Sequence, residues 1–224
     1  SLEPMAPSTF DPNHTFIILA AGVASRYDGE GYKQLLPIEG EPLLKRMVRQ
    51  FLPYGRVVIA AHNPAFAVEG AQFYTPAATR FTCETALFTE SFWTQRTTIL
   101  LGDMFYTPAA VKKIATDRRE LAYFTDGHDI YAIGFQKERA ALLKPAFAEA
   151  IVKALEGNNW GGRLWYTYHK IYNYASRPKV KPWTRGMVYI ADETQDFDKL
   201  EEYNDFLNGK YKNILHPSHR RTLK

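Results

Sequence analysis

The chain has 224 residues, of which 46% are hydrophobic, and this is enough for one compact domain with a substantial core. The net charge of +4 comes from residues 209–224, which hold five Lys/Arg and no acidic residue, whereas residues 1–208 hold 23 Lys/Arg against 24 Asp/Glu. This distribution excludes a broad basic face for binding nucleic acid. The single cysteine, Cys83, excludes an intramolecular disulfide and a thiolate metal cluster, and the longest apolar run, residues 16–24, is too short to span a membrane.

These bounds predict one domain over residues 5–208, followed by a basic tail over residues 209–224. No internal repeat or low-complexity segment interrupts the domain. We expect a soluble protein of a reducing compartment, the cytoplasm, with neither a membrane nor a nucleic-acid partner.

The first predicted element is a buried strand that leads into a turn of small residues. Phe16 to Leu19 are β-branched or bulky at every position, as in a strand covered on both faces of a parallel sheet. In the turn, residues 20–25, the side chains shrink, so backbone amides can converge on an anion. Arg26 and Lys33 add two cations. The stretch therefore predicts a phosphate-binding loop. The alternative is an ordinary turn beside two solvated cations. The Walker motif GxxxxGK[ST] and the dinucleotide-binding motif GxGxxG are both absent.

The next elements are a helix over residues 42–52, a second buried strand over residues 56–61 and a polar loop over residues 79–89. This loop opens a further helix at about Glu84 or Thr85. Its polar residues suit the N-cap and acidic first turn of a helix, and this structural role is the alternative to a role in ligand binding.

A third buried strand, residues 98–101, ends in Gly102-Asp103. In an open parallel sheet the carboxyl ends of the strands line the ligand crevice, so the Asp103 carboxylate is expected there. A magnesium ion needs one or two hard oxygen ligands on a rigid support, and Asp103 supplies one. The alternative is a cap of the helix predicted over residues 108–116, but Thr107 is better placed for that.

The second half of the chain predicts strands at residues 121–124 and 130–135 joined by a hairpin-like turn. A long helical pattern follows over residues 137–155, interrupted by Pro145, and then an aromatic helix over residues 163–174. A basic loop follows, and it either binds a phosphate or is a solvated surface loop; its cations are Lys179, Lys181 and Arg185. A last strand, residues 186–190, leads to Asp192, which is either a second carboxylate at the sheet edge or a cap of the helix predicted over residues 196–207.

Three separated motifs occur in order: LAAG-x-A-x-R at residues 19–26, KQLLPI at residues 33–38 and G-x-PLL at residues 40–44. Together they resemble the signature of nucleotidyltransferases of the nucleotide-diphospho-sugar transferase fold. Ala24 departs from the second glycine that this family usually has. The resemblance implies an α/β fold, a three-layer Rossmann-like sandwich with a mostly parallel central sheet.

The resemblance also implies the roles of the site residues. Arg26 would bind the β- and γ-phosphates, Lys33 would neutralise the α-phosphate, and Asp103 with Asp192 would hold Mg²⁺. Residues 125–185 would form the acceptor-binding part, with Lys179, Lys181 and Arg185 as candidates for the acceptor's phosphate. The residues expected to bind the nucleotide are Leu19, Ala20, Ala21, Gly22, Ser25, Thr82, Glu84 and Thr85.

The expected reaction moves a nucleotidyl group from an NTP to a phosphorylated acceptor, a sugar phosphate or a polyol phosphate, and releases pyrophosphate. The family analogy favours CTP or UTP. The alternatives are a glycosyltransferase of the same fold, although residues 102–104 lack its usual DxD motif, and a non-catalytic nucleotide-binding module. A homodimer through the aromatic stretch is also expected.

Overall fold

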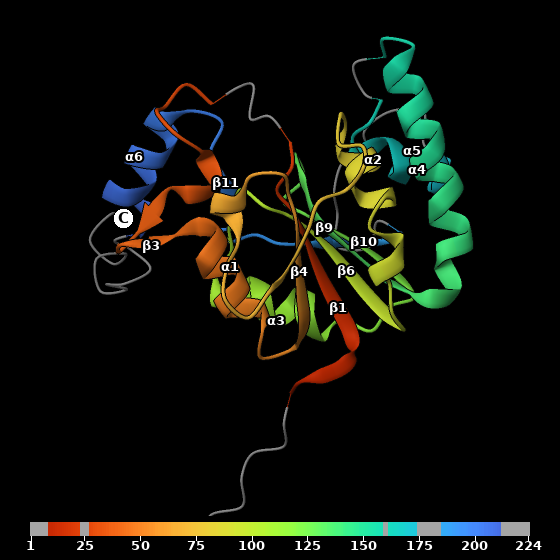
Figure 1. Ribbon diagram of the computed structural model, residues 1–224, viewed down its shortest axis with the longest axis horizontal. Coiled ribbons are helices and arrows are strands. Elements are labelled where there is room, and N and C mark those ends of the chain that lie inside the picture. The colour runs from red at the N-terminus through yellow and green to blue at the C-terminus, as the bar shows by residue number, and fades with distance from the viewer. Residues whose placement is uncertain (1–8, 23–26, 159–160, 174–184, 212–224) are drawn as a thin grey trace, which may run out of the picture.

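The structure, a computed structural model, describes residues 9–22, 27–158, 161–173 and 185–211. Its centre is a seven-stranded sheet in the order β10-β8-β9-β6-β1-β4-β5 (Figure 1). The strands are β1 (Asp11–Leu19), β4 (Gly55–Ala60), β5 (Gln72–Tyr74), β6 (Arg96–Leu101), β8 (Leu121–Thr125), β9 (Ile130–Gln136) and β10 (Met187–Tyr189).

Strand β1 lies in the middle of the parallel part of the sheet. It pairs in parallel with β4 on one side and β6 on the other, and Leu19 is in register with Ala60 and Leu101. Of the seven strands, β9 alone runs against the others, between β6 and β8. The strands other than β9 therefore present their carboxyl ends at one edge of the sheet.

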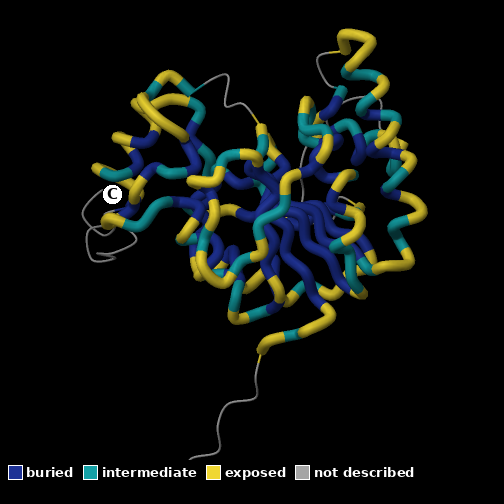
Figure 2. Tube along the Cα trace, in the orientation of Figure 1, coloured by how far each residue is buried: buried dark blue, intermediate teal, exposed yellow. Residues whose placement is uncertain are grey.

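Helices cover both faces of the sheet. Alternate residues of β1 point to opposite faces, so Phe16 and Ile18 belong to one core and Ile17 and Leu19 to the other. Helices α1 (Leu43–Phe51) and α3 (Pro108–Thr116) pack on the first face. Helices α2 (Thr82–Leu87), α4 (Ala140–Leu155) and α5 (Leu164–Tyr172) pack on the second. Figure 2 shows the sheet as the buried centre, and the predicted three-layer fold is confirmed.

A smaller lobe stands beside the sheet. It contains the short pairs β2 (Pro37–Ile38) with β3 (Glu41–Pro42) and β7 (Met104–Phe105) with β11 (Gln195–Asp196), together with α6 (Leu200–Asn208). A third apolar cluster fills this lobe; its buried members are Leu36, Ile38, Leu43, Phe105, Phe197, Tyr203, Phe206 and Tyr211.

Two predicted helices differ from the observed ones. The helix expected from residue 196 begins only at Leu200, because Asp196 pairs with Met104 in the β7–β11 ladder. Helix α4 contains Pro145 without ending there. In α3 the cap is the predicted one, since the Thr107 hydroxyl accepts a hydrogen bond from the Ala110 amide at 3.0 Å. None of the helices in the described ranges is long and apolar enough to cross a membrane.

Candidate active site

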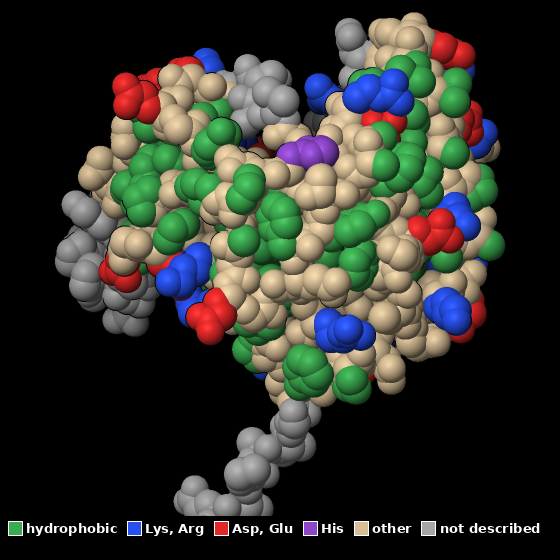
Figure 3. All heavy atoms as spheres, in the orientation of Figure 1, with side chains coloured by type: hydrophobic (Ala, Val, Ile, Leu, Met, Phe, Trp, Pro, Cys, Tyr) green, Lys and Arg blue, Asp and Glu red, His purple; other side chains and the backbone are tan. Residues whose placement is uncertain are grey.

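A cavity of about 490 Å³ lies at the carboxyl ends of β1 and β6. Figure 3 shows the molecule notched at its upper edge, between the lobe of α6 and the helices α4 and α5. The residues that line the cavity come from segments far apart in the sequence. They include six of the predicted site residues: Leu19, Gly22, Lys33, Thr82, Thr85 and Asp103. Parts of the expected acceptor segment, Asp129, Ile130 and residues 161–165, line it too.

Lys33 lies among three acidic residues of the cavity lining, and we call these four residues the charged floor: Lys33, Asp103, Asp196 and Asp198. Its side chain is only 4% exposed, and its Nζ lies 3.0 Å from Asp103 Oδ2. The same Nζ lies 3.7 Å from Asp196 Oδ2 and 3.7 Å from Asp198 Oδ1. Three carboxylates from two separate segments of the chain thus surround one ammonium.

Local backbone structure brings Asp103 to this position. Gly102 follows β6, and its amide donates to Leu19 O at 2.9 Å. A Cβ at Gly102 would lie 2.4 Å from that carbonyl oxygen, so a larger residue would push the ends of β1 and β6 apart. The glycine therefore lets Asp103 leave the sheet directly beside the phosphate-loop strand.

The β7–β11 ladder brings in the other two carboxylates. Asp196 is in register with Met104, the residue after Asp103. Phe197 is fully buried in the third apolar cluster, while Asp196 and Asp198 on either side of it line the cavity. This alternation is the signal that sequence reasoning missed, because extended backbone sends alternate side chains to opposite sides.

The electrostatics of the floor follow from burial and from like charges. Burial, followed by repulsion from Asp103, raises the pKa of Asp196 to about 7, although Lys33 opposes the rise. Burial alone would lower the pKa of Lys33, but the neighbouring carboxylates, Asp103 first, raise it overall. Lys33 therefore stays charged, and the floor carries excess negative charge.

The structure does not bring Asp192, which the sequence predicted as a metal ligand, together with this group. Its Oδ2 accepts a hydrogen bond from Thr107 Oγ1 at 2.6 Å, and its Oδ1 accepts one from the Thr194 amide at 2.8 Å. Asp192 thus braces the N-cap of α3 and does not line the cavity. The second carboxylate beside Asp103 is Asp196.

Glu84 also has a different partner from the one expected. Its buried carboxylate accepts hydrogen bonds from the Arg80 amide at 2.8 Å and from the Arg80 side chain at 2.6 and 3.1 Å. These hydrogen bonds lower the pKa of Glu84. Arg80, with Phe81, Thr82 and Thr85, lines the cavity instead, and Glu84 holds it there.

The remaining predicted residues are placed as follows. Ala20 is buried in the core on the α1 face, and its amide donates to Ala60 O; Ala21, next to Gly22, is partly buried and is not among the lining residues. Ser25, Arg26, Lys179 and Lys181 lie outside the described residues.

Arg185, predicted as a candidate for the acceptor's phosphate, is not among the residues that line this cavity. It precedes β10, so it lies at the amino end of that strand, and its guanidinium stacks over the Tyr172 ring at 5.7 Å. It lines a second hollow, together with Arg119 and Arg139.

A divalent metal ion fits the floor only in part. Asp103 and Asp196 offer the hard oxygen atoms that Mg²⁺ prefers. Within the described ranges, no group of three or more His, Cys, Asp or Glu side chains is arranged to hold a metal. An ion here would therefore take its other ligands from phosphate oxygens and water, as Mg²⁺ in nucleotide sites commonly does.

Residues 16–171 match the family described as the MobA-like NTP transferase domain. This match covers most of the chain. The chain belongs to the MobA-like NTP transferase family. It is therefore an enzyme of the nucleotidyltransferase type, as the sequence motifs predicted.

Several solved structures share the fold of this chain. Rv0371c from Mycobacterium tuberculosis H37Rv is 16% identical with a TM-score of 0.56, covering 88% of this chain and 99% of its own. Another structure of that protein is a complex with manganese, at 17% identity and a TM-score of 0.53, covering 88% and 99%. A CMP:2-keto-3-deoxy-manno-octonic acid synthetase complexed with CTP is 12% identical with a TM-score of 0.55, covering 88% and 97%. The inositol-1-phosphate CTP transferase from T. maritima is 12% identical with a TM-score of 0.53, covering 88% and 95%. A search of curated sequences gave no match.

Proposed function

We propose that this enzyme transfers a nucleotidyl group from an NTP, with CTP or UTP favoured, to a phosphorylated acceptor, a sugar phosphate or a polyol phosphate, and releases pyrophosphate. The observation that carries the proposal is the meeting of Lys33, Asp103 and Asp196 in the cavity that also contains Gly22 of the phosphate loop. Two structural neighbours whose names include CTP support the choice of a pyrimidine nucleotide.

The reaction joins an oxygen of the acceptor's phosphate to the α-phosphorus of the NTP. The bond from that phosphorus to the β-phosphate oxygen breaks, and pyrophosphate leaves with the electron pair. The acceptor's phosphate is already ionised near neutral pH, so catalysis needs positioning and charge neutralisation and no dedicated base.

The chain's residues divide this work. The Gly22 loop, with Ser25, cradles phosphates, Arg26 binds the leaving β- and γ-phosphates, and Lys33 neutralises charge at the α-phosphate. Asp103 and Asp196 would hold Mg²⁺, which when bound would neutralise phosphate charge and help to align the triphosphate. The nucleotide base lies against Thr82 and Thr85, which line the same cavity.

The test is pyrophosphate release with each NTP, Mg²⁺ and a panel of sugar and polyol phosphates. Asp103→Asn should lower kcat by at least about 100-fold, because it removes a charged ligand that acts on the transition state. Asp192→Asn is the matched control: it should keep most of the activity and lower the free energy of unfolding by about 1–3 kcal/mol, because its partners are Thr107 and Thr194.

Three outcomes would contradict the proposal. Consumption of an NDP-sugar without pyrophosphate release would identify the glycosyltransferase alternative. Nucleotide binding without turnover on any acceptor would identify a binding module. Equal losses of kcat in Asp103→Asn and Asp192→Asn would contradict the assignment of the carboxylates.

We also propose a cytoplasmic location and a homodimer, neither of which follows from the geometry of the site. Light scattering on purified protein measures the oligomeric state. A monomer at working concentration would contradict the homodimer.

A further inference from the structure

Lys33 has a second role that its position in the cavity floor indicates. Its Nζ lies where Asp103, Asp196 and Asp198 converge, at 3.0, 3.7 and 3.7 Å from their oxygen atoms. A metal ion shared by the same carboxylates would need this region. Two positive charges in so small a volume repel each other, and the repulsion is poorly screened because the Lys33 side chain is buried.

The three carboxylate oxygens lie at ion-pair distances from Lys33 Nζ, which are longer than metal–oxygen bonds. Mg²⁺ binds carboxylate oxygens at about 2.0–2.1 Å, closer than any of the three lies to Lys33 Nζ. This agrees with the lack, in the described part of the chain, of a group of three acidic, His or Cys residues arranged for a metal. The ammonium must leave and the carboxylates must close in before a divalent ion is bound tightly.

In this exchange the Lys33 side chain can move without its backbone. Its backbone is fixed at the start of the short helix η1 (Lys33–Leu35), where its carbonyl accepts a hydrogen bond from the Leu36 amide at 3.2 Å. A lysine has four flexible methylenes and a compact charge, so its ammonium can shift by several ångströms while its Cα stays in place. The same cavity contains Gly22, so phosphates bound at that loop lie within its reach.

We infer that Lys33 is the resident counter-cation of the carboxylate site and excludes free divalent metal until a nucleoside triphosphate gives its ammonium a second anionic partner. Metal and nucleotide then bind with positive coupling, because each makes room for the other. This inference rests on the proposed function for the identity of the nucleotide. It adds that the enzyme has little affinity for the metal alone.

The test measures binding of Mn²⁺ alone, by electron paramagnetic resonance, to the full chain. Lys33→Met removes the charge and keeps the length, and it should bind Mn²⁺ at least about 10-fold more tightly than the wild type. Lys33→Arg keeps the charge and should bind as weakly as the wild type. Lys170→Met is the matched control, because Lys170 pairs with Glu149 at 3.0 Å outside the cavity, and it should change nothing.

A second titration tests the coupling in the wild type. A non-hydrolysable CTP analogue should raise its Mn²⁺ affinity by at least about 10-fold, and should raise that of Lys33→Met by less. Circular dichroism shows whether Lys33→Met is folded. If it is not, the same comparison is made between Asp198→Asn and Lys33→Met/Asp198→Asn, in which one carboxylate charge has also been removed.

Equal Mn²⁺ affinity in folded wild-type and Lys33→Met proteins would overturn the inference, even in an enzyme that releases pyrophosphate. Failure of the proposed function gives a different result. In that case no NTP would yield pyrophosphate, but Lys33→Met would still bind Mn²⁺ more tightly than the wild type in the absence of nucleotide.

Discussion

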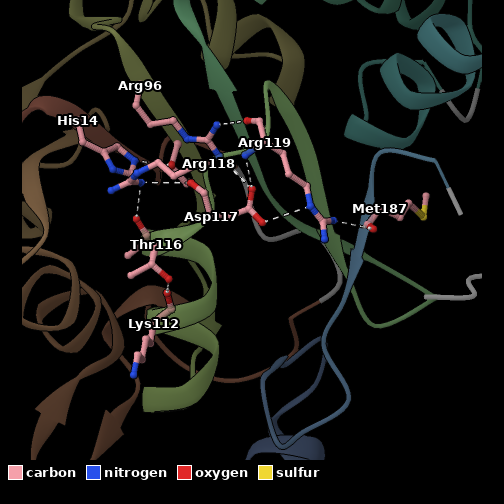
Figure 4. A network of polar contacts seen from close by, with 10 residues as sticks. His14, Arg96, Lys112, Thr116, Asp117, Arg118, Arg119 and Met187 are labelled. Carbon is pink, nitrogen blue, oxygen red and sulfur yellow. Dashed lines mark hydrogen bonds and ion pairs between the residues drawn. The ribbon is translucent and has the colours of Figure 1, made fainter. Parts of the chain in front are cut away.

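Buried ionisable side chains occupy both edges of the sheet, and their partners decide their charge. At the carboxyl edge Lys33 is surrounded by carboxylates and stays charged. At the amino edge His14 is fully buried, with its Nε2 2.7 Å from Thr98 Oγ1. Figure 4 shows Arg96 and Arg118 beside it. Burial first, and then the charges of Arg96 and Arg118, lower the pKa of His14 to about 3.

This pKa predicts how stability depends on pH. In the unfolded chain a histidine has a pKa of about 6.5, so as the pH falls the unfolded state binds the proton first. The contribution of His14 is therefore fully present above pH about 6.5 and is lost toward pH 3, at up to about 1.4 kcal/mol per pH unit. Urea unfolding at several pH values measures it.

His14→Gln is the control, because it keeps a polar side chain near Thr98 but does not titrate in this range. The difference in unfolding free energy between wild type and variant should shrink, and then reverse, as the pH falls. Curves that stay parallel from pH 7 to pH 4 would contradict the low pKa.

At the scale of elements, the position of the acidic residues in the cavity depends on the short β7–β11 ladder, in which each strand has two residues. The β7–β11 pairing holds Asp196 beside Met104, and Phe197 anchors the turn that follows. The Phe197 ring lies 5.6 Å from the Tyr203 ring and 5.2 Å from the Phe206 ring. An aromatic anchor in the small lobe therefore positions two carboxylates of the cavity floor.

Phe197→Leu and Phe206→Leu form a matched pair of variants. Both shorten a buried aromatic side chain in the same cluster, so each should lower the free energy of unfolding by about 1–3 kcal/mol. Only Phe197 lies between Asp196 and Asp198, so only Phe197→Leu should also raise the KM for the NTP, by about 10-fold. Initial rates and urea unfolding measure the two effects, and equal KM values would refute the anchoring role.

At the scale of the whole molecule, the two large cores share one sheet, so they should unfold together. Cys83 is fully buried in the core under α4 and α5, and burial raises the pKa of its thiol. Its amide donates to Gly162 O at 2.9 Å, which ties α2 to the segment that enters α5.

The labelling of Cys83 by a thiol reagent should therefore report global opening. We expect labelling of the native protein to be at least about 100-fold slower than that of the urea-unfolded chain, because the thiol is both inaccessible and protonated. Its rate should follow the global free energy of unfolding as urea is raised. Fast labelling that does not depend on urea would show that α5 opens independently of the sheet.

The central strands, the segment after β1 that brings Gly22 to the cavity, and the place of Asp103 could be predicted from the sequence alone. These features are local: apolar runs of strand length, a turn of small residues and a Gly-Asp pair that must follow a strand at the ligand edge. The Thr107 cap was predictable for the same reason, since an N-cap depends on a few neighbouring residues.

Only the tertiary structure decided which distant side chains meet. Asp192 and Asp196 are four residues apart, and both follow the last strand, so their spacing does not show which one faces Asp103. The β7–β11 ladder and the burial of Phe197 select Asp196, while the cap of α3 takes Asp192. The contacts of Glu84 and Arg185 could not be read from the sequence for the same physical reason, because a charged side chain binds the partner that the fold brings to it, and residue type alone does not name that partner.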